Sequence, residues 1–151
     1  MSELAERMQH DLKDAMKARD EVRVATLRMA IAAVKEAAVA GAQARQLGDD
    51  DVEKVLRTQV KRRDEAAEAY EAAGRHEQAQ RELDERAILS TYLPEELGED
   101  ELEALVDEAL ATGGFTDASQ MGPAMNTVMA AVAGRAEGKR VSAIVKAKLA
   151  G

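Results

Sequence analysis

The side chains of this sequence that are best suited to bind a ligand are five basic residues near its C-terminus. They fall within fourteen residues that hold one acidic group. Two glycines flank a short turn before the expected last helix, and glycine lets a backbone approach a phosphate closely. The N-terminus of that helix would add free N–H groups and the positive end of a dipole, which together attract anions. The pattern makes candidate phosphate ligands of Arg135, Lys139, Arg140, Lys146 and Lys148, with Gly134 and Gly138 at the turn.

Basic residues also have structural roles, and the sequence leaves these open. Cations in the last turns of a C-terminal helix complement that helix's own dipole, and a short basic helix is commonly a solvated surface. Arg28 lies beside the apolar seam of its helix, where it could pair with an acidic residue of another helix or face a ligand. A second basic stripe is expected on the helix that begins near residue 50. Acidic residues stand three or four positions away from it, so pairing along the helix is favoured over nucleic-acid contact. This stripe consists of Lys54, Arg57, Lys61 and Arg62.

Catalytic and metal-binding patterns are missing from the sequence. It contains no cysteine, which excludes disulfides, thiolate metal sites and cysteine nucleophiles. Its two histidines, His10 and His76, are preceded at three residues by Arg7 and Ala73, so neither belongs to the Glu-x-x-His pattern of di-iron helical bundles. No glycine-rich loop has the lysine and spacing of a P-loop, and no serine lies in a nucleophile motif. We therefore expect no catalytic residue, no metal and no cofactor.

The elements that position the basic residues are expected to be helices throughout, giving an all-α protein. Hydrophobic residues make up 46% of the chain and aromatic residues 2%, and much of the apolar fraction is alanine, the strongest helix former. Apolar residues recur at helical spacing, and no segment alternates with a period of two. We expect seven helices: over about 3–18, from a cap at residue 20 to about 38, from 50 to 74, up to about 91, around 102–110, around 121–132 and around 141–149.

Local signals set several helix ends. Asp50 and Glu53 have the spacing of a capping box, and Thr116 is expected to cap the sixth helix. Gly98 would be a tolerable N-cap for the fifth helix. Pro94 pushes the residue before it out of the helical region, which ends the fourth helix. The sequence therefore predicts two units: an N-terminal helical hairpin or bundle over 1–93 and a small three-helix unit over 94–151.

Charge is distributed unevenly along the chain. The net charge of −8 argues against a general nucleic-acid binder, which would usually be basic. However, residues 94–116 carry eight acidic and no basic groups, whereas residues 117–151 carry five basic and two acidic groups. The start of the chain is polar, and no stretch reaches the ~18 apolar residues of a membrane span. We therefore expect a cytoplasmic protein.

Three stretches carry motifs that together point to a family. The first is Leu27-Arg28-Met29 followed by Ala33-Val34-Lys35. The second contains Lys61-Arg62-Arg63-Asp64, Tyr70, Ala73-Gly74-Arg75 and Tyr92-Leu93-Pro94. The third contains Met121-Gly122, Met125, Met129 and Gly134-Arg135-Ala136-Glu137-Gly138-Lys139. In this order and spacing, over nearly the whole chain, they resemble the YqeY family, which is related to the tail of the GatB subunit of tRNA-dependent amidotransferases.

The resemblance implies a non-catalytic protein that binds tRNA or assists a tRNA enzyme. The implied partners are tRNA and an aminoacyl-tRNA synthetase or amidotransferase. The alternative is an adaptor that docks on a translation enzyme through the acidic fifth helix or through a groove lined by Met121, Met125 and Met129, residues that otherwise belong to the core. The function we rank last is amidotransferase activity, a carbon–nitrogen ligation with glutamine as the amido donor. Glu137 stands where the family often has Asp, and this departure leaves the resemblance intact.

Overall fold

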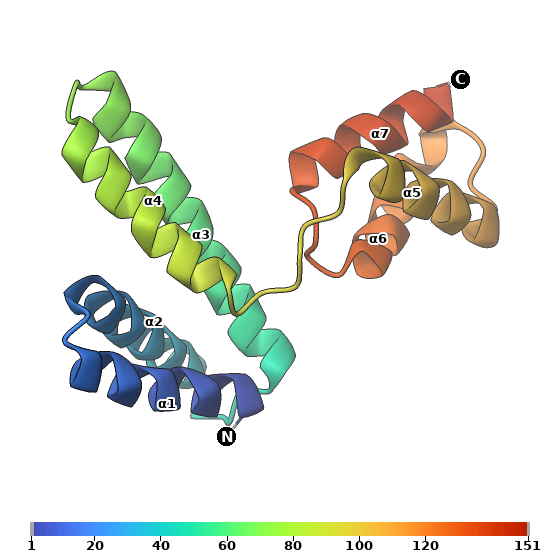
Figure 1. Ribbon diagram of the computed structural model, residues 1–151. Helices are drawn as coiled ribbons and strands as arrows, with labels where there is room; N and C mark the ends of the chain where they lie inside the picture. The colour runs from blue at the N-terminus through green and yellow to red at the C-terminus, as the bar shows by residue number, and fades with distance from the viewer. Residues whose placement is uncertain (1, 151) are drawn as a thin grey trace. The chain divides into compact units, whose positions relative to one another are not determined.

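The protein is all-α, as expected. The computed structural model describes residues 2–150, and within that range every regular element is a helix (Figure 1). The chain divides into two compact units, one ending at Pro94 and the other beginning at Glu95. The first unit contains α1 (Glu3–Ala18), α2 (Glu21–Val39), α3 (Asp49–Ala72) and α4 (His76–Ser90). The second contains α5 (Glu99–Gly113), the short 3-10 helix η1 (Ala118–Gln120), α6 (Met121–Val132) and α7 (Gly138–Ala150).

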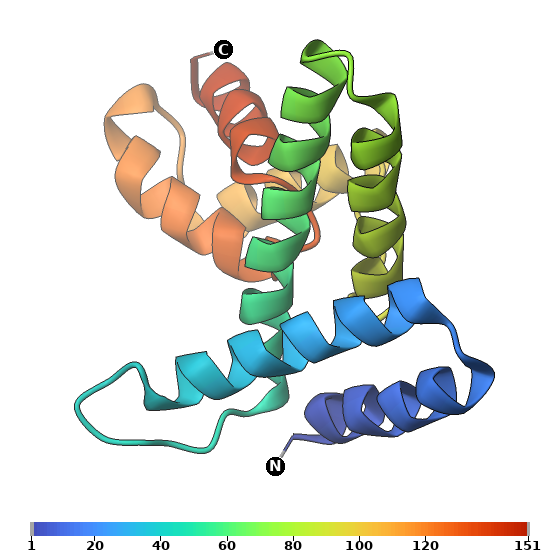
Figure 2. The same cartoon turned by 90° about the vertical axis from the view of Figure 1, so that its left-hand side faces the viewer.

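Helices α1 and α2 form an antiparallel hairpin (Figure 2). Ser2 caps α1, since its Oγ accepts a hydrogen bond from the Ala5 N–H at 2.9 Å. Arg19 then adopts a left-handed conformation with φ 57°, which reverses the chain. Asp20 caps α2 as predicted, with its carboxylate accepting from the Arg23 N–H at 3.1 Å. The starts of α1 and α2 are thus set by short-range polar contacts, which explains why the sequence located them.

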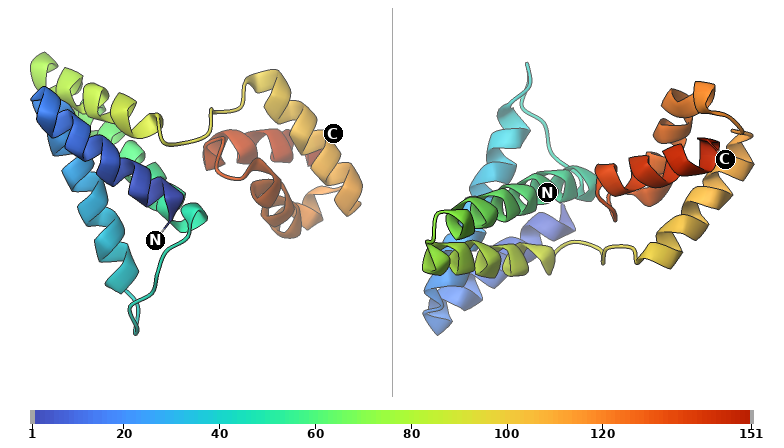
Figure 3. Two further views of the ribbon diagram at one scale, coloured as in Figure 1. Left: turned by 60° about the horizontal axis from the view of Figure 1, so that its bottom comes forward. Right: turned by 90° about the horizontal axis from the view of Figure 1, so that it is seen from above.

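Helices α3 and α4 form a second antiparallel hairpin (Figure 3). Gly74, with φ 75°, provides the left-handed residue that the reversal needs. The predicted capping box of Asp50 and Glu53 is wrong, because α3 begins at Asp49 with Gly48 as its N-cap. Instead, the Asp51 carboxylate accepts a hydrogen bond from the Gly48 N–H at 3.3 Å. Three consecutive aspartates stabilise this first turn through the helix dipole, and the N-cap lies two residues before the predicted Asp50.

The core of the first unit joins all four of its helices. Met8, Leu27, Leu56 and Leu89 are fully buried and belong to one cluster. Complete burial of such side chains stabilises a fold by about 1.5–3 kcal/mol each. Tyr92 joins the same cluster just after α4, and this residue is 4% exposed. The end of α4 is therefore fixed to the rest of the unit before the chain leaves it.

The second unit is a three-helix core whose helix ends are set by glycine and aspartate. Gly98 is the N-cap of α5, as predicted, and Gly114 ends that helix with φ 71°. Thr116 is not the cap that the sequence suggested. Asp117 caps the inserted helix η1, accepting from the Ser119 N–H at 2.8 Å, whereas Thr116 donates its own N–H to Gln120 Oε1 at 2.7 Å. The extra 3-10 turn moves the start of α6 to Met121, away from Thr116.

The apolar faces of α5, α6 and α7 meet in a single cluster in the second unit. Its fully buried members are Leu102, Val106, Ala124, Val128, Val132, Val141 and Val145. The methionine ladder of α6, Met121, Met125 and Met129, lies half-buried against this cluster. It therefore contributes to the core, although part of each side chain remains at the surface.

Candidate nucleic-acid interface

The turn before α7 binds the segment that leads into α5. The Leu97 N–H donates to the Arg135 carbonyl at 2.7 Å, and Arg135 Nε donates to the Glu95 carbonyl at 2.9 Å. Gly134 enters this turn with φ 77°, a conformation that glycine adopts without steric cost. Gly138 has no positive φ, and a Cβ there would meet nothing within 4 Å. Of the two predicted glycines, only Gly134 has a backbone conformation that favours glycine.

Arg140 is also committed to its own unit. Two of its guanidinium nitrogens lie 3.4 Å from the Leu97 carbonyl oxygen, and Nη2 lies 3.0 Å from Glu99 Oε2. The Arg140 side chain is 35% exposed and the Glu99 carboxylate 64% exposed. Arg135 and Arg140 therefore hold both backbone groups of Leu97 and the first turn of α5. These two predicted phosphate ligands have a structural role that the sequence did not reveal.

Lys148 forms an ion pair on the surface between α7 and α5. Its Nζ lies 3.0 Å and 3.2 Å from the two carboxylate oxygens of Asp107. The hydrogen bond to Asp107 raises the pKa of Lys148 above its ordinary value. Because the pair is exposed to solvent, it contributes little to stability.

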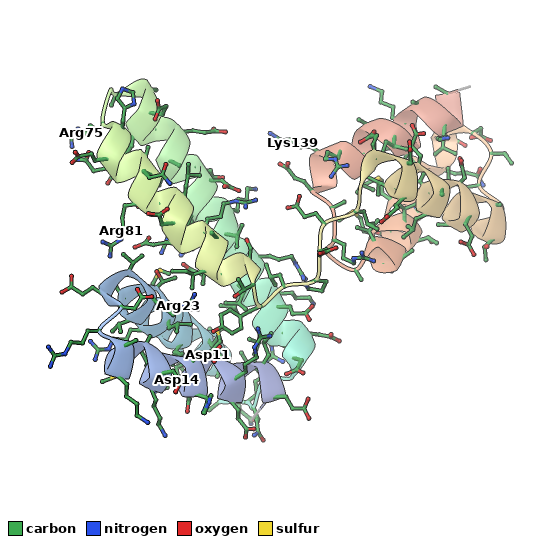
Figure 4. All side chains as sticks on the ribbon, in the orientation of Figure 1. Asp11, Asp14, Arg23, Arg75, Arg81 and Lys139 are labelled. Carbon is green, nitrogen blue, oxygen red and sulfur yellow. The ribbon has the colours of Figure 1, made fainter. Side chains whose placement is uncertain are left out.

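Lys139 and Lys146 differ from the other three cations. Both are exposed, and neither forms an ion pair or side-chain hydrogen bond with any residue in the described range 2–150. They stand seven positions apart on α7, which places them on nearly the same face with about 10 Å between them along the axis. Lys139 lies in the first turn of α7, and its side chain extends away from that helix (Figure 4).

The N-terminus of α7 adds backbone donors beside Lys139. The Val141 N–H donates to the Glu137 carbonyl, which closes the first helical turn. Among residues 2–150, none accepts a hydrogen bond from the N–H groups of Gly138, Lys139 or Arg140. The exposed start of α7 therefore combines N–H groups and a lysine that have no partner among the described residues, an arrangement suited to an anion.

The second basic stripe is only partly paired, contrary to expectation. Arg57 forms the predicted pair along α3, with its Nη1 3.6 Å from Glu53 Oε2. Lys54, Lys61 and Arg62 are exposed and make no ion pair with any residue that the structure describes. Acidic residues stand four positions away in the sequence, but their carboxylates form no ion pair with these three side chains. Three cations of the stripe thus remain available at the surface of α3.

Arg63, a half-buried residue to which the sequence assigned no role, joins α3 to α4. The Nε atom of Arg63 lies 3.2 Å from Glu85 and 3.6 Å from Glu82, with all three side chains 20% exposed or less. Ion pairs at this depth fix the register of packed helices more than they stabilise them. Only the folding of α4 back onto α3 brings these residues together, so no local signal identified them.

Tyr92 has an equally specific environment at the end of α4. Its hydroxyl donates to the Asp11 carboxylate, and the Arg7 guanidinium lies 4.6 Å from the centre of its ring. Burial and the hydrogen bond to Asp11 raise the pKa of the Tyr92 hydroxyl well above its ordinary value. The Tyr-Leu-Pro motif marked this position in the sequence, but its partners on α1 were not predictable. Arg28 forms no ion pair with a described residue, and its Nη2 lies 3.9 Å from the Met16 sulfur.

An apolar hollow lies in the first unit. It has a volume of about 230 Å³ and is lined mainly by apolar side chains of α1, α2 and the loop before α3, among them Met8, Ile31 and Leu47. None of the predicted basic residues lines it. Within residues 2–150, no group of three His, Cys, Asp or Glu side chains could hold a metal ion, and no helix is long and apolar enough to cross a membrane.

A family model described as Yqey-like protein matches residues 5–149. The chain belongs to the YqeY-like family. The match spans both units, so the basic turn, α7 and the α3–α4 hairpin all lie inside it. A search of curated proteins found none that matches this YqeY-like chain.

Proposed function

We propose that this YqeY-like protein binds tRNA through α7 and serves as a non-catalytic accessory to a tRNA enzyme. The observation that carries the proposal is the pair Lys139 and Lys146, which are exposed on one face of α7 and form no ion pair with any residue in the range 2–150. Arg135, Arg140 and Lys148 bind residues of their own unit, so they support the surface instead of forming its free charge.

The electrostatics of the second unit support a restricted contact with phosphates. The protein carries a net charge of −8, so a nucleic acid would be repelled by much of its surface. A binding surface must then concentrate cations locally, as the start of α7 does with a lysine, a helix dipole and free N–H groups. Each phosphate that such a group neutralises makes binding depend on salt, with a logarithmic slope of about −0.7 to −0.9.

The test is a fluorescence-polarisation titration of labelled bulk bacterial tRNA at several salt concentrations. The Lys139→Gln/Lys146→Gln variant should lower the magnitude of the salt slope by about 1.4–1.8, the value for two lost phosphate contacts. A matched control, Lys13→Gln/Lys17→Gln, removes two exposed lysines of α1 and should leave the slope nearly unchanged. Absence of binding to tRNA even in dilute buffer would refute the proposed function.

The acidic face of α5 favours an adaptor as the second candidate. Asp100, Glu101, Glu103 and Glu108 are all exposed on this helix. Such a surface suits a basic patch on a partner protein and repels nucleic acid. Under this hypothesis tRNA would not bind, and the α7 variant would retain its interaction with a translation enzyme. Glutamine-dependent amide transfer by the purified chain would contradict both proposals.

A further inference from the structure

Lys54, Lys61 and Arg62 form a second cationic surface, which we define as the α3 band. We infer that the α3 band is a second contact for the RNA phosphate backbone, so that both units of the chain hold the same class of ligand. This inference rests on the proposed function, because it takes tRNA as the ligand of α7. It adds a surface on the first unit that the proposed function does not require.

The α3 band differs from the neighbouring arginines of α3 in its lack of ion pairs with described residues. Arg57 is neutralised by Glu53 on the same helix, and Arg63 is held by Glu82 and Glu85 of α4. The three members of the band are exposed and form no ion pair with a described residue. Asp50 and Glu65 stand four positions from Lys54 and Lys61, yet neither pairs with them. The helix therefore keeps these cations free although it offers several carboxylates nearby.

The geometry of the band matches the α7 surface. Lys54 and Lys61 are seven residues apart, as are Lys139 and Lys146, so each pair spans about 10 Å on one helix face. A rigid helix that presents two cations at this spacing can contact phosphates along one strand without reading base edges. The same spacing and exposure thus occur in both units, and neither lysine pair forms an ion pair with a described residue.

An RNA backbone fits the α3 band better than a membrane does. Its apolar neighbours Val55 and Val60 are half-buried, so no exposed apolar side chain is available for insertion among lipid tails. Thr58, between the two lysines, uses its hydroxyl to bond the Lys54 carbonyl at 3.2 Å and adds no charge. The band is therefore a short, purely electrostatic surface, which is the kind that phosphates recognise.

The experiment measures tRNA affinity against salt for the full-length chain and three variants. The variants are the α3 variant Lys54→Gln/Lys61→Gln/Arg62→Gln, the α7 variant Lys139→Gln/Lys146→Gln and the control Lys13→Gln/Lys17→Gln. We expect the magnitude of the salt slope to be lower by about 2.1–2.7 in the α3 variant than in the parent. For each contact removed, the fall in affinity between 50 and 200 mM salt should be about threefold smaller. The circular dichroism spectrum and melting temperature should match those of the parent, since the substituted side chains form no ion pair within the part of the chain that the structure describes.

The outcomes separate the two ideas. If the α3 variant matches the control while the α7 variant loses slope, the α3 inference is overturned and the proposed function stands. If only the α3 variant loses slope, the α3 band contacts tRNA but the assignment of α7 fails, and the inference that both units hold RNA is overturned. If no form of the protein binds tRNA, both fail. Displacement of tRNA by poly-glutamate at equal charge concentration would assign the band to acidic proteins and overturn RNA as its ligand.

Discussion

Replacing Arg140 by glutamine should loosen the segment that enters α5, and this effect should appear even in the absence of any ligand. The guanidinium bonds the Leu97 carbonyl through two nitrogens at 3.4 Å and the Glu99 carboxylate at 3.0 Å. Leu97 itself is 5% exposed, so its carbonyl lies next to a buried side chain. The variant removes the charge and leaves the N–H bond to the Arg135 carbonyl as the remaining backbone hydrogen bond described for Leu97.

The size of the effect follows from these contacts. A hydrogen bond from a charged donor contributes about 1.5–3 kcal/mol when its geometry is good. The 3.4 Å distances to the Leu97 carbonyl oxygen are long for such a bond, so the contribution is at the low end of this energy range. The pair with Glu99 is 64% exposed on the carboxylate side, so it adds between about 0 and 1 kcal/mol. We therefore expect a cost of about 1–2 kcal/mol for opening this segment.

Amide hydrogen exchange measured by NMR tests the expectation directly. The Leu97 N–H is protected by its 2.7 Å bond to the Arg135 carbonyl. A loss of ~1.4 kcal/mol corresponds to a tenfold faster exchange, so Leu97 should exchange about five to thirty times faster in Arg140→Gln. Lys139→Gln removes a neighbouring cation without a partner and should leave that rate unchanged. Equal exchange rates for Leu97 in Arg140→Gln and the parent protein would refute the assigned structural role of Arg140.

Two further predictions follow from other contacts. Tyr92→Phe removes the hydroxyl bond to Asp11 and should lower the free energy of unfolding by about 1–2 kcal/mol at neutral pH. Because the folded state raises the Tyr92 pKa above the ordinary 10.0, this contribution is fully present below pH 10 and is lost as the pH rises further; urea titrations at pH 8 and pH 11 should therefore show a smaller difference between the two proteins at pH 11. Glu99→Gln/Asp107→Asn removes the carboxylates that hold cations of α7, so it should raise tRNA affinity by several-fold, and by more than Asp100→Asn/Glu101→Gln, which removes two unpaired charges from the same helix. Equal gains for both double variants in the polarisation titration would show that only the net charge matters.

The sequence by itself determined the helices and most of their ends, because these depend on contacts within a few residues. The apolar spacing, the Asp20 cap, the Gly98 cap and the left-handed glycines at 74 and 114 all act within one or two turns. The same locality explains two errors at helix starts. Near residue 49 and near residue 117 several residues compete to cap one helix, and small differences in backbone conformation select between them. The family resemblance was also visible at this level, since ordered local motifs carry it.

Only the tertiary structure decided which cations are free. Arg135, Arg140 and Lys148 find their partners about forty residues away in the sequence, on the segment before α5 and on α5 itself. Lys139 and Lys146, from the same run of basic residues, find none among the residues that the structure describes. An ion pair depends on the distance between two side chains in space, and the spacing of charges along one helix does not set that distance. The packing of α5 against α7 therefore divided one basic motif into residues that hold the unit together and residues that remain at its surface.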